Sequence, residues 1–130
     1  MRILFDARGV QERSDGLSNY IRHLLTALLQ IDAENEYVVL LNAAMRQHLA
    51  DARLLTRPNL QAVFTSIPFM GLPQQIGVPW LIRRLPRASV YHYPHFDLPL
   101  LAHARSVVTI HDLNQICLPS YFDSSKRAKQ

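Results

Sequence analysis

The segment from Val107 to Asp112 most constrains the fold of this chain, because an apolar, β-favouring run leads directly into two titratable side chains. The run Val-Val-Thr-Ile is typical of a buried strand, and His111 and Asp112 follow it without a spacer. Ligands of open α/β sheets bind outside the carboxyl ends of the strands, so this arrangement would bring acid, base and hydrogen-bonding groups to a substrate. The alternative is that His111 only caps the strand and Asp112 begins a turn, since short motifs often occur without function.

Length and composition indicate a single globular domain. The chain has 130 residues, of which 48% are hydrophobic and 18% charged, and these values favour a packed core over disorder. Cys117 is the only cysteine, which excludes an intrachain disulfide and fits a reducing compartment. Asp6 and Arg8 interrupt the N-terminal apolar run, so this run is neither a signal peptide nor a membrane span. We therefore expect a cytoplasmic protein.

The net charge of +4 comes almost entirely from arginine, whose planar guanidinium suits phosphate and other anionic groups. The arginines are scattered and form no basic stripe with interleaved aromatic residues, so nucleic-acid binding is not expected. Residues 80–85 combine an apolar run that begins at Trp80 with Arg83 and Arg84. This pattern favours a helix packed on the core with a solvated arginine face, and an amphipathic surface for anionic lipid is the alternative.

Short apolar runs alternate with helical patterns along the chain. The predicted strands are Ile3–Phe5, Tyr37–Leu41, Leu60–Thr65, Ser89–His92 and Val107–Ile110. The predicted helices are Leu17–Leu28, Ala43–Leu55 and Gln74–Leu85, the last of them kinked or restarted at Gly77 and Pro79. This alternation predicts an α/β domain with a Rossmann-like, doubly wound parallel sheet. We expect residues 1–123 to form this domain and residues 124–130 to begin a helix that leads towards a second domain.

A polar loop after the first strand places Gly16 directly before the first helix. The unpaired amides and the positive dipole of a helix N-terminus attract phosphate or carboxylate, and glycine lets the backbone approach the anion closely. The G-x-G-x-x-G fingerprint and the P-loop are both absent, so Gly16 as a simple turn residue is an equal alternative. We also expect strands 3–5 and 107–110 to be central neighbours, which would bring Gly16 and His111 to the same carboxyl edge.

Other common site chemistries find little support in the sequence. His92 and His95 are separated by a proline, and together with His111 they fit no common metal-ligand spacing. The G-x-S-x-G nucleophile motif is absent, and Cys117 has no recognisable nucleophile signature. We therefore expect neither a metal ion nor a cofactor.

Seven segments of the chain together resemble the family 4 (group 1) glycosyltransferases. These segments are Ile3–Arg8, Asp15–Arg22, Asn35–Tyr37, Ile67–Phe69, Leu81–Leu85, Val90–Phe96 and Val108–Leu113. They keep the family's order, span nearly the whole chain, and are similar to the bacterial mannosyltransferase-like branch that builds surface polysaccharides. The resemblance implies a GT-B architecture of two Rossmann-like domains, of which this chain matches the N-terminal, acceptor-side domain.

The resemblance also implies a retaining enzyme that transfers a mannose-like sugar from a nucleotide-sugar (GDP- or UDP-sugar) to a glycan or lipid-linked acceptor. In the family, the C-terminal domain binds most of the nucleotide-sugar and carries a pair of spaced glutamates. The 130-residue chain lacks a match to that domain and is therefore expected to be inactive alone. Peripheral contact with the inner membrane is a further implication of the family.

By the same resemblance, Gly16, Leu17 and Ser18 would lie against the donor diphosphate. His111 would sit beside the transferred sugar with Asp112 next to it, and these two are the predicted catalytic residues. Many relatives have a second glycine where this chain has Ser18, so the backbone there does not have the close approach that glycine allows. The predicted acceptor-binding residues are Tyr20, His95 and Phe96, and acceptor specificity is expected from loops 66–73 and 93–104.

Two other functions are alternatives to the transferase. One is a stand-alone flavodoxin-like module that binds a phosphorylated ligand without chemistry, and the other is a small hydrolase or isomerase that uses His111 and Asp112 directly. The coding sequence after Gln130 distinguishes the transferase from these alternatives. A second α/β domain with spaced glutamates favours the transferase, and a stop codon favours the binding module.

Overall fold

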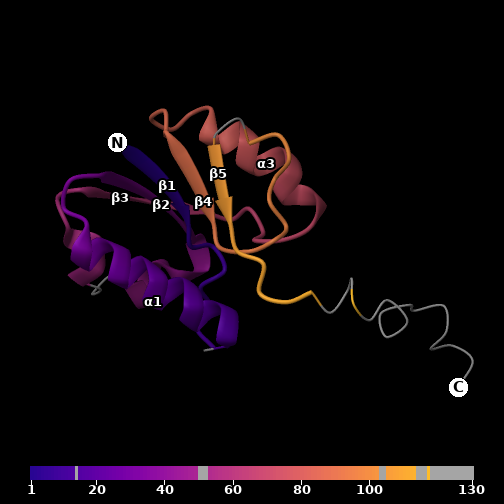
Figure 1. The fold of residues 1–130 in the computed structure, drawn as a ribbon, viewed down its shortest axis with the longest axis horizontal. Coiled ribbons are helices and arrows are strands. Elements are labelled where there is room, and N and C mark those ends of the chain that lie inside the picture. The colour runs from indigo at the N-terminus through magenta and orange to yellow at the C-terminus, as the bar shows by residue number, and fades with distance from the viewer. Residues whose placement is uncertain (14, 50–52, 103–104, 114–116, 118–130) are drawn as a thin grey trace, which may run out of the picture.

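The computed structural model describes residues 1–13, 15–49, 53–102, 105–113 and 117. Its centre is a five-stranded sheet in which every strand runs parallel to its neighbours, in the order β3-β2-β1-β4-β5 (Figure 1). The strands are β1 (Arg2–Asp6), β2 (Glu36–Asn42), β3 (Leu60–Thr65), β4 (Val90–Tyr93) and β5 (Arg105–Val108). The predicted Rossmann-like α/β class is confirmed. The predicted domain boundary at residue 123 and the helix at 124–130 lie outside the described residues.

The strand order reverses beside β1, because the chain builds β2 and β3 on one side of it and β4 and β5 on the other. The prediction that β1 and β5 are neighbours is therefore wrong: β4 lies between them, and His92 pairs with Phe5 on one side and Val107 on the other. Tyr91 and Tyr93 of β4 are fully buried, whereas all four residues of β5 are exposed. Among the described residues, β5 is thus an edge strand.

β5 also ends earlier than the predicted strand Val107–Ile110. Its last pair joins Val108 to Tyr93. The residue after Tyr93 is Pro94, which has no N–H to donate to a further rung of the ladder. The chain therefore leaves the sheet after Val108, and His111 lies in the loop that follows.

Helix α1 (Gly16–Ile31) covers one face of the sheet (Figure 1). Asp15 caps this helix, because its carboxylate accepts a hydrogen bond from the Ser18 amide at 2.7 Å. That bond satisfies one of the amides that the start of a helix leaves unpaired. Ile21 and Leu25 recur at helical spacing and are buried, so they form the core-facing stripe of α1.

The side chains of the sheet alternate between two hydrophobic cores. The core on the α1 side contains Phe5, Ala7, Val10, Ile21, Leu25, Leu29, Tyr37, Val39, Leu41 and Met45. The core on the other side, beneath α3 (Leu72–Ile82), contains Leu4, Val38, Leu40, Val78, Tyr91 and Tyr93. Helices thus cover both faces (Figure 1), which is the doubly wound arrangement predicted from the alternating elements.

The predicted helix 43–55 is not continuous. Its described parts are a 3-10 turn η1 (Ala43–Met45), a single α-helical turn α2 (Arg46–Leu49) and a second 3-10 turn η2 (Arg53–Thr56); residues 50–52 lie outside the described residues. The Asn42 side chain accepts a hydrogen bond from the Ala44 amide at 2.9 Å, which fixes a tight first turn. Across the part of the chain that the structure describes, every helix is too short or too polar to traverse a bilayer.

Helix α3 differs from its prediction in its middle and at its end. It does not restart at Gly77 or Pro79, since one helix spans Leu72–Ile82 with Pro79 inside it. A Cβ at Gly77 would lie 3.2 Å from side-chain atoms of Ile67, so glycine lets the helix approach the loop after β3. The amides of residues 84 and 85 donate to carbonyls three residues back, and the predicted last turn is therefore a tighter 3-10 turn.

The turn between α1 and β2 is built around Asp32. Its carboxylate accepts hydrogen bonds from the Asn35 side chain at 2.8 Å, from the Tyr37 hydroxyl at 2.7 Å, and from two backbone amides. These bonds favour the ionised form and lower the pKa of Asp32 to about 2. Burial, followed by the hydrogen bond to Asp32, raises the pKa of Tyr37 to about 12.

Because the pKa of Asp32 is lower in the folded chain than in the unfolded chain, its stabilising effect is present above about pH 4 and is lost as the pH falls towards about 2. We expect Asp32→Ala to make the thermal unfolding temperature less dependent on pH in this window, as followed by circular dichroism. Glu34→Ala, which removes a neighbouring exposed carboxylate, is the matched control. An equal effect of the two substitutions would contradict this prediction.

Candidate functional site

Four of the predicted site residues lie together at the carboxyl edge of the sheet. Tyr20 lies in the first part of α1, His95 and Phe96 follow β4, and His111 follows β5. Tyr20 and His111 are in edge-to-face contact with ring centroids 4.8 Å apart, and the rings of His95 and His111 are 6.1 Å apart. The start of α1 and His111 therefore share one carboxyl edge, as predicted, although β1 and β5 are not neighbours.

His111 is held in place from two sides. On one side, Nε2 of His111 lies 3.1 Å from the carbonyl oxygen of Pro94. On the other side, the Tyr20 ring packs on the His111 ring, and the hydroxyl of Tyr20 lies 3.1 Å from the hydroxyl of Thr109. Because a carbonyl oxygen can only accept, this geometry assigns the proton to Nε2 and leaves Nδ1 of the neutral ring as an acceptor. His111 and the adjacent Asp112 are both exposed, so a ligand can reach them.

His95 is the most buried member of this cluster, with 8% of its surface exposed. It stacks on Phe96 with ring centroids 4.3 Å apart, and its Nδ1 accepts a hydrogen bond from the Asp97 amide at 3.3 Å. Burial lowers the pKa of His95, the charge of His111 lowers it further, and Asp97 opposes both effects. The His95 ring is therefore neutral at pH 7, with Nε2 as its donor.

We expect His111→Ala to raise the pKa of His95, because the substitution removes a neighbouring imidazole that, in its protonated form, opposes protonation of His95. The pKa is read from the imidazole protons in an NMR titration of the 130-residue chain. His23→Ala, on the exposed face of α1, should leave the pKa of His95 unchanged. If His111→Ala also leaves it unchanged, the two rings do not interact in solution.

The three residues predicted to contact a diphosphate differ in their accessibility. Gly16 begins α1, and a Cβ added there would meet nothing within 4 Å, so the space beside it is open. Ser18 is fully buried: its amide donates to Asp15, and its hydroxyl accepts from the Gln11 amide at 3.1 Å. Ser18 thus fixes the loop before α1. The first-turn amides of Gly16 and Leu17 have no carbonyl partner within the helix, so they are the donors suited to an anion.

A pocket of about 600 Å³ opens beside this cluster, between the loop after β1, the start of α1, the segment after β2 and the loop after β3. Asp15 and Leu17 line it from the α1 side, and Phe69 lines it from the loop after β3. Phe69 also contacts His95, with ring centroids 5.7 Å apart. The pocket and the histidine cluster are therefore neighbours that share Phe69, and the pocket volume is within the range of small-ligand sites.

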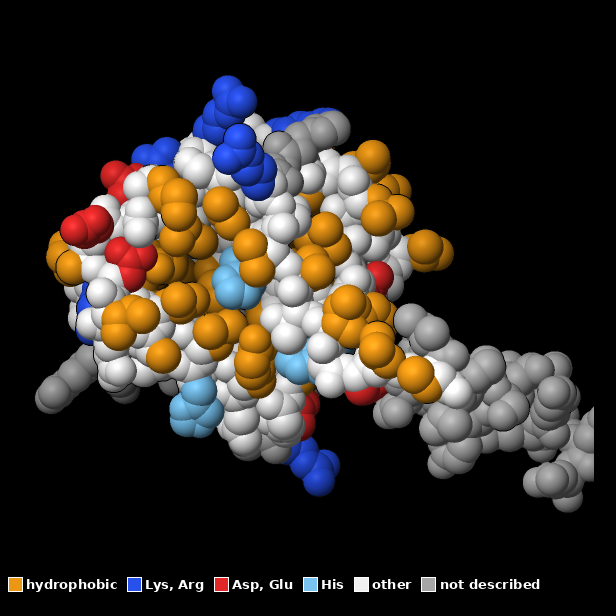
Figure 2. Space-filling model, viewed as in Figure 1, with side chains coloured by type: hydrophobic (Ala, Val, Ile, Leu, Met, Phe, Trp, Pro, Cys, Tyr) orange, Lys and Arg blue, Asp and Glu red, His pale blue; other side chains and the backbone are white. Residues whose placement is uncertain are grey.

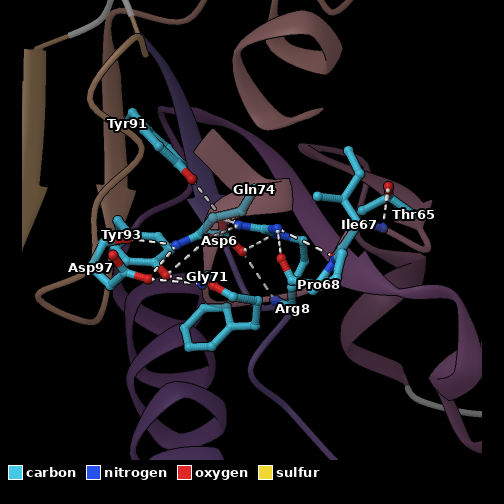
Figure 3. Close-up of polar contacts among 11 residues, drawn as sticks. Asp6, Arg8, Thr65, Ile67, Pro68, Gly71, Gln74, Tyr91, Tyr93 and Asp97 are labelled. Atoms are coloured by element: carbon cyan, nitrogen blue, oxygen red, sulfur yellow. Dashed lines mark hydrogen bonds and ion pairs between the residues drawn. The ribbon is translucent and has the colours of Figure 1, made fainter. Parts of the chain in front are cut away.

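Beneath the pocket lies a buried ion pair that the sequence analysis did not identify (Figure 3). Asp6 and Arg8 are fully buried, and the Arg8 guanidinium donates to the Asp6 carboxylate through Nε at 2.9 Å and Nη2 at 2.7 Å. The Tyr91 hydroxyl donates to the same carboxylate at 2.5 Å. Burial acts to lower the pKa of Arg8, but the charge and hydrogen bonds of Asp6 outweigh it and raise the pKa. The Arg8 guanidinium is therefore charged.

Hydrogen bonds extend from this ion pair to two loops (Figure 3). Arg8 donates to the Pro68 carbonyl at 2.7 Å and to the Gln74 side chain at 3.1 Å. Gln74 donates in turn to the carbonyl and the carboxylate of Asp97 at 2.7 and 2.8 Å. No buried side-chain nitrogen or oxygen of the described residues lacks a partner. The network thus fixes the loops after β3 and β4, in which acceptor specificity was predicted, relative to the end of β1.

The candidate metal ligands considered in the sequence are not assembled into one site. His92 packs edge-on against Phe5 with ring centroids 5.0 Å apart, on the side of the sheet that faces α1, and burial lowers its pKa. Within the described ranges, no group of three or more His, Cys, Asp or Glu side chains is arranged to hold a metal ion.

Comparison of the chain with models of known protein families, with curated proteins and with solved structures finds no match. Functional interpretation therefore depends on the residues and on the geometry described above.

Proposed function

We propose that this chain is the N-terminal, acceptor-side domain of a nucleotide-sugar-dependent glycosyltransferase with a GT-B architecture. Its reaction moves a mannose-like sugar, with retention, from a GDP- or UDP-sugar to a glycan or lipid-linked acceptor. The observation that carries the proposal is the contact of Tyr20 with the segment after β5. Tyr20 and Thr109 are 89 positions apart and share a hydrogen bond, while the Tyr20 ring packs on His111. Two of the seven segments that carry the family resemblance, Asp15–Arg22 and Val108–Leu113, therefore meet at the carboxyl edge of the sheet, where ligands of open α/β sheets bind.

Two groups of this chain act on the donor in the proposed reaction. The first-turn amides of Gly16 and Leu17, aided by the dipole of α1, stabilise the negative charge that develops on the leaving diphosphate. Nδ1 of His111 accepts a hydrogen bond from a hydroxyl group of the transferred sugar, since Nε2 is already engaged by Pro94. The exposed Asp112 carboxylate provides a second acceptor beside it.

In this proposal the acceptor binds on the side of His111 that faces away from the donor. Phe96 is 52% exposed and stacked on His95, so it offers an apolar face against which a sugar ring can pack. Tyr20 supplies a hydroxyl at the same edge. The buried ion pair of Asp6 and Arg8 acts at a distance, because it holds the loops that carry these contacts.

The test is sugar transfer by the product of the complete reading frame, compared with the 130-residue chain. The complete protein should release GDP or UDP from a nucleotide-sugar in the presence of saccharide or lipid-linked acceptors, above a hydrolysis control. The 130-residue chain should not, because positioning both substrates supplies much of the rate of a group transfer. Turnover by the 130-residue chain, or a reading frame without a second α/β domain, would overturn the proposal.

The pocket favours one other function, a stand-alone flavodoxin-like module that holds a phosphorylated ligand. A volume of about 600 Å³ formed by this chain alone is sufficient for such a ligand. Calorimetric titration of the 130-residue chain with FMN and with sugar phosphates tests this alternative. Saturable binding, combined with the absence of transfer by the complete protein, would favour the module over the transferase.

A further inference from the structure

Asp97 joins the two loops in which acceptor specificity is predicted. It lies in the loop after β4, and its carboxylate accepts hydrogen bonds from the Gly71 amide at 3.1 Å and from the Gln74 side chain at 2.8 Å (Figure 3). Gly71 precedes α3 with a φ of 90°, which favours glycine, and it has no side chain that could cap the helix. Asp97 therefore supplies a carboxylate to the start of α3 from another loop, at the end of the helix where negative charge is stabilised.

The backbone of Asp97 connects this contact to His95. The Asp97 carbonyl accepts from the Gln74 side chain at 2.7 Å, and the Asp97 amide donates to Nδ1 of His95 at 3.3 Å. Gln74 is fully buried and accepts from the Arg8 guanidinium at 3.1 Å. The position of His95 is thus linked through Asp97 and Gln74 to the buried ion pair.

The contact with Asp97 determines which nitrogen of His95 carries the proton. Because an amide can only donate, Nδ1 is the acceptor and the neutral ring has its proton on Nε2. Nε2 has no hydrogen-bond partner among the described residues, whereas every fully buried side-chain nitrogen among them has one. Nε2 therefore reaches the surface, although His95 as a whole is buried. Figure 2 shows histidine side chains that reach the surface between hydrophobic ones.

Three aromatic rings fix the orientation of the His95 ring. It is stacked on Phe96 with ring centroids 4.3 Å apart, and it meets the rings of Phe69 and Tyr93 edge-on. The Nε2–H group is therefore a donor that is already ordered before a ligand binds. A preorganised donor contributes more to binding than one that must first be ordered.

We propose that Asp97 is a positioning residue, which holds His95 so that its Nε2–H donates a hydrogen bond to the acceptor substrate. The His111 ring, 6.1 Å away, has the opposite assignment, because its Nε2 faces the Pro94 carbonyl and its Nδ1 is left to accept. His95 thus selects a ligand oxygen that accepts, such as a hydroxyl or ring oxygen of a saccharide. An ammonium group, which can only donate, does not fit beside it.

The state of His95 is measured on the 130-residue chain by NMR, through two-bond proton–nitrogen correlations at about pH 8, where an imidazole is neutral. The wild-type ring should show one form, with its proton on Nε2. Asp97→Ala should release the loop, so that both tautomers appear and the ring protons of His95 lose the ring-current shifts caused by Phe96 and Phe69. Circular dichroism melts show whether each variant folds.

Asp97→Asn separates the geometry of this contact from its charge. The amide oxygen of asparagine can still accept from Gly71 and Gln74, so the single tautomer should be retained. The negative charge is lost, however, and it acts to raise the pKa of His95. Asp97→Asn should therefore lower this pKa without changing the tautomer. Glu34→Ala, which removes an exposed carboxylate from the turn between α1 and β2, should change neither.

The role of Asp97 towards the acceptor is measured on the complete protein, since the identity of the ligand rests on the proposed transferase function. Asp97→Ala should raise KM for the acceptor about fivefold, the effect of one neutral hydrogen bond, and should raise KM more than it lowers kcat. Asp97→Asn should restore KM towards the wild-type value.

A wild-type His95 with its proton on Nδ1 would overturn the inference, and so would unchanged His95 signals in folded Asp97→Ala. If Asp97→Ala does not fold, two tautomers in Asp97→Asn would overturn it instead. A complete protein that transfers no sugar contradicts the proposed function and not the state of His95. A complete protein that transfers sugar with an unchanged KM in Asp97→Ala contradicts the positioning role and leaves the transferase intact.

Discussion

Arg8→Met should lower the free energy of unfolding by about 3–5 kcal/mol, because it leaves the Asp6 carboxylate buried without its counter-charge. Both side chains of the wild-type pair have no exposed surface. Methionine fills much of the volume of the arginine stem, so the loss measures the uncompensated charge more than a cavity. Domains of this size are stable by about 5–15 kcal/mol, and this one substitution would therefore remove a large part of the total.

Urea unfolding of the 130-residue chain, followed by circular dichroism, measures this effect. Arg22→Met replaces an exposed arginine of α1 and should stay within about 0.5 kcal/mol of wild type. The double variant Asp6→Asn with Arg8→Met should be more stable than Arg8→Met alone, because no net charge then remains buried. A loss in Arg8→Met no larger than in Arg22→Met would show that the buried pair does not hold the end of β1.

The positions of the strands follow from local sequence, but their order in the sheet does not. Ile3–Phe5 and the run that begins at Val107 are both short and mainly apolar, and both were predicted to be central strands beside the ligand crevice. Burial separates them: Phe5 is fully buried, whereas Val107 is 49% exposed on an edge strand. The deciding feature is β4, whose two tyrosines fill the sheet beside β1 although the strand is only four residues long. Strand order depends on such long-range packing, which periodicity does not encode.

In the candidate site, too, some features follow from local sequence and others depend on long-range packing. Gly16 and His111 could be placed at one edge from sequence, because the end of one strand and the helix start that follows another strand share the carboxyl edge of a parallel sheet. The ion pair could not, since its partners come from distant parts of the chain: Tyr91 is 85 positions from Asp6, and Gln74 is 66 from Arg8. The signal in the sequence is an acidic and a basic residue, Asp6 and Arg8, two positions apart at the end of a buried strand.

In the complete protein, His111→Ala should lower kcat/KM for sugar transfer by about a hundredfold. Loss of one preorganised polar contact to a reacting centre typically costs about 3 kcal/mol. The contacts of His111 are the reason to expect preorganisation: the Pro94 carbonyl fixes Nε2, and the Tyr20 ring packs edge-to-face on the imidazole. The predicted loss depends on the proposed transferase function, so it is measured on the complete protein rather than on the 130-residue chain.

Alanine substitutions of three other histidines test whether a histidine acts in the reaction or only in the fold. His23 lies on the exposed face of α1, so His23→Ala should leave both activity and stability nearly unchanged. His92 packs against Phe5. His92→Ala should therefore lower the thermal unfolding temperature, while kcat of the folded enzyme changes little. His95 lies in an acceptor loop, so its loss should raise KM more than it lowers kcat. If His111→Ala keeps near-normal activity, or loses activity only together with thermal stability, then His111 serves to close the segment after β5 onto Tyr20 and the catalytic assignment is wrong.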